Sequence, residues 1–220
     1  MRNILILVLF ATLFTACQKQ PEMAYNAVTE PARDRSMFVI SGKVIWEGNR
    51  LGLQSGVAGV VVTLSGAESG TATTGANGLF AFTVSTPGDY ELSAVKNRPP
   101  PLCLNGVTSA DAFRLQQHVT GALPLGDPYK VIAADANLSN SVTAADASFI
   151  IQGVIGNPIS QGVFSANTWR FVPELYIFPN PLLPFGAPGC IEFTNISTDQ
   201  TANFIGLKLG DVNATANPAN

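Results

Sequence analysis

The stretch ADANLSNSVTAAD, residues 134–146, carries a regular series of oxygen-bearing side chains in a chain that is otherwise poor in charge. Counted from its first aspartate, positions one, three, five, nine and twelve are Asp135, Asn137, Ser139, Thr143 and Asp146. A twelve-residue calcium loop presents oxygens at these positions and adds the backbone carbonyl of its seventh residue, here Ser141. The spacing therefore predicts a Ca²⁺ site formed by these six residues.

A helix cap explains part of the same pattern. In a capping box, the Thr143 side chain would accept from the first turn of a helix while Asp146 reaches back to the backbone of Thr143. That interpretation leaves Asp135, Asn137 and Ser139 unexplained, so we favour a cation site that also begins a helix. Because only two of the six predicted ligands are carboxylates, we expect weak binding, about 10⁻⁴ to 10⁻³ M.

A related segment lies thirty-five residues earlier in the chain. NGVTSADAFRLQQHVTG (105–121) and NSVTAADASFIIQGVIG (140–156) share nine of 17 aligned residues. Each copy predicts a loop that runs into a short helix and ends at a glycine. Short helices are marginal in isolation, so we expect the two to pack together. The apolar residues expected to face a core are Phe113, Leu115, Val119, Phe149, Ile150, Ile151, Val154 and Ile155.

The first repeat lacks half of the calcium series. Counting back from Asp111, positions one, three and five have no side-chain oxygen, being Pro100, Leu102 and Leu104. The missing half has a counterpart in GDVNAT (210–215), which places oxygens at these three positions, on Asp211, Asn213 and Thr215.

Two interpretations of this tail are open. In one, the tail folds back and completes a split second cation site with Asp111, Asp211 and Asn213. In the other, GDVN forms a simple turn and Asp111 only caps its helix.

The paired loop–helix repeat, together with PYKVIAAD and FIGLKLGDVN, resembles the dockerin type I module of Bacteroidetes-type surface proteins, over roughly residues 100–215. This resemblance implies calcium-stabilised folding. In cellulosomal relatives it also implies docking onto a cohesin partner within polysaccharide-degrading assemblies. The first repeat departs from the family pattern because its loop has lost the opening ligands. We place the dockerin-like calcium module at residues 100–158.

Residues 37–97 predict an antiparallel β-sandwich. Short strands such as VAGVVVTLSG and LFAFTVS are rich in Val, Thr and aromatic residues and are separated by the turns GANG and TPGD. The run TTGANGLFAFTVSTPGDYELSAV resembles the carboxypeptidase regulatory-like and collagen-adhesin B-type sandwiches, which have a carbohydrate-binding-like fold. Strand-like segments return in residues 163–215 and predict a C-terminal β extension. The predicted fold is therefore mixed, mostly β with a small α part.

The N-terminus predicts export. Residues 1–17, MRNILILVLFATLFTAC, combine one Arg, an apolar run and small residues, as in a signal peptide. FTAC resembles a bacterial lipobox, which implies that Cys17 is lipidated and anchors the chain to a membrane, in our prediction the outer membrane with exposure at the cell surface. The alternative is an ordinary secretory signal. Residues 18–36 are polar and predict a flexible tether.

Export to an oxidising compartment has a consequence for the other two cysteines. Cys103 and Cys190 form an even pair, and we predict a disulfide between them. The alternative is two unpaired buried thiols.

The remaining composition argues against nucleic-acid binding and catalysis. The net charge is −3, and no basic run offers a phosphate-binding surface. No G-x-S-x-G, H-E-x-x-H or phosphate loop occurs, and the single histidine, His118, stands in a predicted helix. We predict a non-enzymatic surface protein for adhesion or assembly in a polysaccharide-degrading system, with a cohesin-like protein as partner. The alternative is a carbohydrate-binding accessory protein that uses the sandwich to bind a polysaccharide.

Overall fold

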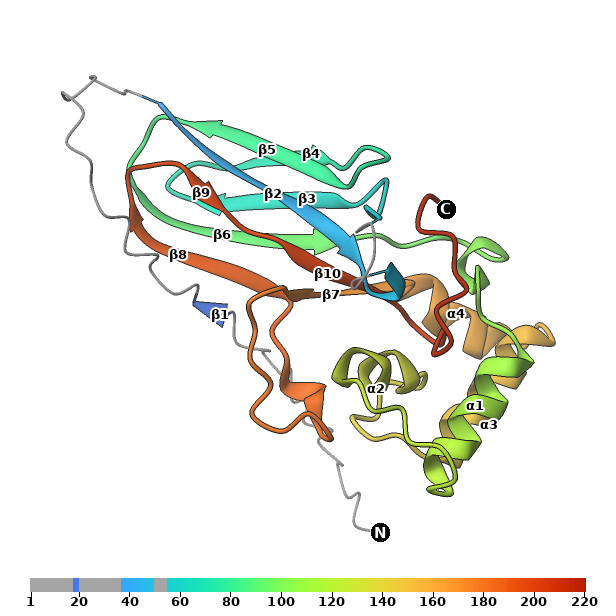
Figure 1. Ribbon diagram of the computed structural model, residues 1–220. Helices are drawn as coiled ribbons and strands as arrows, with labels where there is room; N and C mark the ends of the chain where they lie inside the picture. The colour runs from blue at the N-terminus through green and yellow to red at the C-terminus, as the bar shows by residue number, and fades with distance from the viewer. Residues whose placement is uncertain (1–17, 20–36, 50–54) are drawn as a thin grey trace, which may run out of the picture.

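The computed structural model describes residues 18–19, 37–49 and 55–220. The predicted signal peptide with Cys17, and the predicted tether apart from its first two residues, lie outside these ranges. Within them, two β-sheets face each other and four helices gather at one end of the pair (Figure 1). The predicted mixed fold, mostly β with a smaller helical part, is confirmed.

Ten strands of the described chain form the two sheets. The first sheet has the order β1 (Gln18–Lys19), β8 (Cys190–Ile196), β6 (Gly88–Val95), β3 (Val61–Gly66), β4 (Gly70–Thr73). The second has the order β5 (Leu79–Val84), β2 (Phe38–Trp46), β10 (Phe204–Lys208), β7 (Trp169–Pro173), and β9 (Gln200–Thr201) also pairs with β2.

Alternating side chains make the sandwich. In β5, Phe80, Phe82 and Val84 are buried while the residues between them are exposed. Because successive side chains of a strand point to opposite faces, this alternation turns one apolar face inward. The facing sheet contributes buried residues of the same kind, and its member Leu92 is fully buried. The resulting core is the main apolar cluster of the described chain. The predicted β-sandwich is therefore confirmed.

The strands within residues 163–215 complete this sandwich and do not form a separate extension. β8 pairs antiparallel with β6, and β10 lies between β2, to which it is parallel, and β7. The helices therefore occur in the chain between β6 and β7, two strands of one sandwich. Sequence alternation predicted these strands but not their pairing, because pairing partners are distant in the chain.

The helical part begins as the repeat predicted. Its helices are α1 (Ser109–Val119), α2 (Pro128–Ala134), α3 (Ala144–Val154) and α4 (Pro158–Ala166). Single-turn 3₁₀ segments are η1 (Glu47–Asn49), η2 (Leu102–Leu104) and η3 (Pro184–Gly186). Thr108 and Thr143 cap α1 and α3, each with a complete capping box. Past each helix end stands a glycine at positive φ, 75° for Gly121 and 93° for Gly156, a conformation that glycine adopts without strain.

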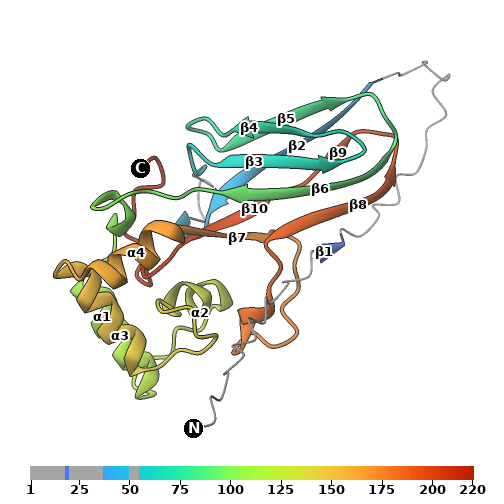
Figure 2. The ribbon, with the colours of Figure 1, turned by 180° about the vertical axis from the view of Figure 1, so that it is seen from behind.

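The two repeat helices lie side by side, as expected (Figure 2). Leu115 and Ile150 are fully buried between them and Phe164 of α4. Our prediction that the eight named apolar residues of the repeats face this core is wrong for five of them, which are exposed, namely Phe113, Val119, Ile151, Val154 and Ile155. Short helices can bury only one face, and these residues occupy the other. In the described residues, no helix has the length and apolar character needed to cross a membrane.

Candidate calcium loops

The chain between α2 and α3 wraps around two carboxylates. Asp135 follows the last residue of α2, and its two oxygens accept from the backbone N–H groups of Ser139 (2.8 Å) and Asn140 (2.9 Å). Asp146, in the first turn of α3, accepts from the N–H groups of Asn137 (3.2 Å) and Thr143 (2.9 Å). Residues from both halves of the loop therefore close around the same two side chains.

Left-handed backbone makes this tight course possible. Leu138 and Asn140 have φ of 61° and 60°, and Asn is among the few residues that adopt this conformation readily. The Ser139 hydroxyl lies 3.3 Å from the Ser141 carbonyl oxygen. The predicted fifth-position and seventh-position oxygens are thus adjacent, although the hydroxyl currently donates to the carbonyl.

Electrostatics in this loop favour a cation. Asp135 is 1% exposed and Asp146 is fully buried. Burial raises the pKa of Asp135 above its ordinary value, and the neighbouring Asp146 charge adds to the rise. Backbone donors and Arg170 oppose it. Within the described ranges, neither carboxylate forms an ion pair with Lys or Arg, so a bound cation would supply the missing positive charge.

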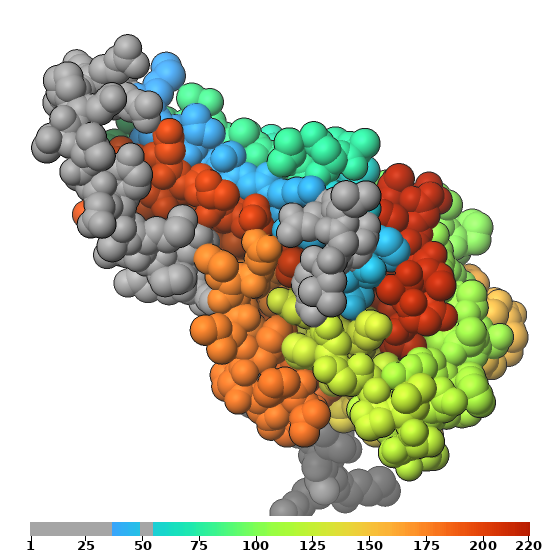
Figure 3. All heavy atoms as spheres, viewed as in Figure 1, coloured from blue at the N-terminus to red at the C-terminus, as the bar shows by residue number. Residues whose placement is uncertain are grey.

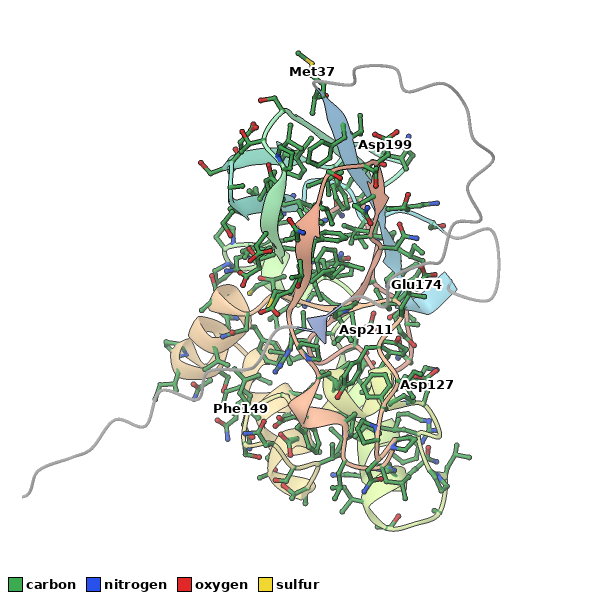
Figure 4. All side chains as sticks on the ribbon, turned by 90° about the vertical axis from the view of Figure 1, so that its left-hand side faces the viewer. Met37, Asp127, Phe149, Glu174, Asp199 and Asp211 are labelled. Atoms are coloured by element: carbon green, nitrogen blue, oxygen red, sulfur yellow. The ribbon has the colours of Figure 1, made fainter. Side chains whose placement is uncertain are left out.

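The C-terminal tail folds back onto the first repeat. The backbone N–H groups of Val212 (3.0 Å) and Asn213 (3.2 Å) both donate to one oxygen of Asp111, and Thr108 N–H donates to the other (2.8 Å). Asp211 lies where the sandwich meets the helices (Figure 4). The structure thus brings together the two half-loops that lie a hundred residues apart in the sequence.

The tail repeats the opening half of the contiguous loop. Asp211 accepts from the N–H groups four and five residues later, Thr215 (3.0 Å) and Ala216 (2.8 Å), as Asp135 does from its own successors. Ala214 has φ of 58°, matching the left-handed fourth position of the contiguous loop.

The two halves of the split loop also meet as the contiguous halves do. Thr215 Oγ1 donates to the Gly106 carbonyl (3.1 Å), the counterpart of the contact between Ser139 and Ser141. Gly106 is therefore the seventh-position residue of the split loop. Gly106 was not among the site residues predicted from the sequence, although its place five residues before Asp111 corresponds to the seventh position.

The split loop also holds buried charge. Asp111 is fully buried and Asp211 is 3% exposed. Burial raises the pKa of Asp211, and the Asp111 charge acts in the same direction. Lys208, 2% exposed, lies nearby and donates to the carbonyls of Cys103 and Leu209. Burial lowers the pKa of Lys208 to about 8, against the opposing charge of Asp211.

Each loop offers two carboxylates and not more. In the part of the chain that the structure describes, no three His, Cys, Asp or Glu side chains gather where they could hold a metal. The remaining oxygens would come from amide, hydroxyl and carbonyl groups, which calcium accepts. Both loops therefore fit a hard cation bound weakly.

The predicted disulfide is wrong. Cys103 is a free thiol, fully buried in the helical core, with its Sγ 3.9 Å from the Gln161 carbonyl oxygen. Cys190 begins β8 in the sandwich. Burial raises the pKa of the Cys103 thiol, which makes it less reactive.

Comparison with known families supports the class of protein that the fold defines, a β-sandwich protein. A family described as the second beta sandwich domain of NOMO1-like BOS complex subunits matches residues 37–98. This match covers less than half of the chain and includes β2 to β6 but not the strands that complete the sheets. No curated protein is detectably similar to the chain.

Proposed function

We propose that this protein is a non-catalytic, exported surface lipoprotein whose helical part is a calcium-stabilised, dockerin-like module for adhesion or assembly. The observation that carries the proposal is the residue-by-residue match between the contiguous loop, Asp135 to Asp146, and the split loop formed by residues 105–111 and 211–215. Two loops with different chain connectivity share their carboxylate acceptors, most of their backbone donors and one left-handed position, which is expected if both serve one ligand.

Calcium is the ligand that these groups suit. In the contiguous loop it would be held by Asp135 and Asp146 with oxygens of the neighbouring polar residues. In the split loop it would be held by Asp111, Asp211 and Asn213. When bound, calcium neutralises the buried carboxylates, so it stabilises the fold by mass action.

Exposed apolar side chains on the repeat helices support a protein partner. Phe113 is 62% exposed on α1, and Ile155, at the end of α3, is 76% exposed. Val119, Ile151 and Val154 are also exposed on these helices. Apolar groups of this size on adjacent helices favour association with another protein, and the dockerin resemblance makes a cohesin-like protein the partner we propose, within a polysaccharide-degrading system.

Membrane attachment rests on the N-terminal sequence. The apolar run and FTAC support lipidation of Cys17 after cleavage, and hence an outer-membrane anchor facing the cell surface. This segment lies outside the described residues.

A groove on the outer face of the second sheet favours one alternative, carbohydrate binding by the sandwich. Its lining includes Ser41, Lys43, Thr201 and Asn203 beside Leu79. The hydroxyl groups of Ser41 and Thr201 suit a polysaccharide, and a glycan array would detect its binding.

Calcium binding can be tested through stability. At about 10 mM calcium and a dissociation constant of about 1 mM, each occupied site should raise the free energy of unfolding by about 1.4 kcal/mol. Urea unfolding of the full chain should show this gain twice. Asp135→Asn and Asp211→Asn should each lose one gain, and the double variant both.

A matched control is available in Glu192→Gln, which removes an exposed carboxylate from β8 and should keep the full calcium effect. If wild-type stability does not change with calcium, the proposal fails. A gain lost in Asp135→Asn but intact in Asp211→Asn would restrict binding to the contiguous loop.

A further inference from the structure

The loop between β7 and β8, residues 174–189, is an apolar projection from the sandwich. From Leu175 to Gly189 it contains no charged residue. It extends beside α2 in Figure 1, and in Figure 3 it forms the orange prominence at the lower left of the visible face. Soluble proteins rarely expose a large contiguous apolar patch, and such patches mark contacts with proteins, membranes or ligands.

One side of the loop is fixed to the helical part. The ring centroids of Tyr176 and Phe178 lie 4.9 Å apart, and Phe178 packs edge-on against Tyr129 of α2 at 5.2 Å. The alternate residues, Leu175 and Ile177, point away and are 49% and 85% exposed. Packing of the aromatic side therefore holds the aliphatic side outward.

The tip of the loop continues this aliphatic surface. Leu182 and Leu183 are 74% and 65% exposed. The Asn180 side chain accepts from Leu182 N–H (3.0 Å), and the Asn180 carbonyl accepts from Leu183 N–H (3.1 Å). Because these tip amides are already paired inside the loop, moving the tip out of water leaves fewer backbone donors unpaired.

The position of β1 indicates that the loop contacts a lipid membrane. β1 runs parallel to β8, with Gln18 opposite Ile191 and Lys19 opposite Glu192. Parallel pairing places the amino end of β1 beside the amino end of β8, where the 174–189 loop joins the sheet. Cys17, the proposed lipid attachment point, directly precedes β1 in the sequence, so a lipid on Cys17 would enter the membrane near the base of this loop.

We propose that the 174–189 loop inserts Leu175, Ile177, Leu182 and Leu183 into the lipid bilayer beside the N-terminal attachment point. The inference rests on the membrane anchor of the proposed function. The loop would act as a second contact that orients the sandwich on the membrane.

A lipid-borne quencher can test this contact. The full chain, isolated from membranes and reconstituted in phosphatidylcholine–phosphatidylglycerol vesicles, would carry an environment-sensitive fluorophore on Ile177→Cys. Nitroxide-labelled phosphatidylcholine should quench most of its emission. Ile159→Cys on α4 is the matched control, because Ile159 is an equally prominent isoleucine, 77% exposed, in a different part of the molecule (Figure 1). It should not be quenched, and unmodified protein gives the labelling background.

The outcomes separate the loop from the anchor. Full-chain protein that does not float with vesicles would contradict the anchor and, with it, the loop contact. Protein that floats while position 177 stays unquenched would overturn the loop contact alone, including the case where a protein partner shields the loop. In the quenched protein, adding Leu182→Ser and Leu183→Ser should reduce quenching several-fold, and Ile155→Ser should leave it unchanged.

Discussion

The contiguous loop and the split loop place the same groups around two buried carboxylates, but they reach that arrangement by different routes. The contiguous loop closes within residues 135–146, so local chain geometry is sufficient. The split loop joins Asp111 to the backbone of Asn213, which is 102 residues away in the sequence. The comparison teaches that this loop geometry depends on which groups meet, and not on an unbroken chain between them.

The difference has an energetic side. Closing a long chain segment costs more conformational entropy than closing a short one, so the split loop depends on contacts outside the loop itself. Val212 is buried in the helical core and Ala216 is buried beside Gly106. The Pro218 carbonyl accepts from Ala58 N–H (3.2 Å) and Lys96 Nζ (3.0 Å). The folded sandwich and helices together hold the tail in place.

Removing the tail should disrupt the split loop and cause the largest loss of stability. Deletion of residues 210–220 empties the sites of Val212 and Ala216 and leaves Asp111 without two donors. We expect the free energy of unfolding, measured in urea without calcium, to fall by about 3–5 kcal/mol. The contiguous loop should keep its calcium response, because none of its residues is lost.

Deletion of only Ala219 and Asn220, which are exposed, is the matched control and should change stability little. Adding the missing segment back as a synthetic peptide should restore part of the stability. A tail-deleted protein as stable as the full chain would mean that the tail is not part of the fold.

The pH dependence of the free energy of unfolding should differ between the two loops, and this effect should be intermediate in size. The pKa of Lys208, near the split loop, is lowered to about 8 from 10.5. Near the contiguous loop the basic group is Arg170, and a guanidinium keeps its charge in proteins. Between about pH 8 and pH 10.5, the folded and unfolded pKa values of Lys208, the unfolded state binds more protons than the folded state. Stability therefore rises with pH across this window. We expect a contribution of about 1–3 kcal/mol from Lys208, measured by urea unfolding without calcium.

Lys208→Met should flatten this rise. Lys96, whose pKa is also lowered to about 8 by burial, contributes its own rise, so Lys96→Met is the reference for a buried lysine outside both loops. A Lys208→Met protein with the wild-type slope would show that Lys208 does not titrate in this window.

Glycine substitutions at the left-handed fourth position of each loop should have the smallest effects on stability. Ala214 in the split loop has φ of 58° and Leu138 in the contiguous loop has φ of 61°. Ala214→Gly should stabilise the protein by about 0.5 kcal/mol, because the relief of left-handed strain exceeds the entropy cost of glycine.

Leu138→Gly should instead destabilise the protein by about 1–2 kcal/mol, because the Leu138 side chain packs against the helical core. Thermal unfolding of both variants would measure the difference. Equal effects of the two changes would contradict the role assigned to Leu138 packing.

Features that depend on nearby residues could be predicted from the sequence. The repeat predicted two helices that begin after Thr108 and Thr143, and the alternation in LFAFTV predicted a strand with one buried face. The sequence also predicted which residues could form the contiguous loop, because all of them lie within the twelve residues 135–146. These features depend on residues that are only a few positions apart in the chain, so the sequence pattern alone is sufficient to predict them.

Only the tertiary structure decided the features that depend on distant partners. It joined Asp111 to the tail, paired β8 with β6 and β10 with β2, and separated Cys103 from Cys190. It also chose which apolar residues are buried, leaving Phe113 and Ile177 exposed. Composition makes these residues equally suited to a core, and only the packing of whole elements, which balances many distant contacts against chain entropy, selects among them.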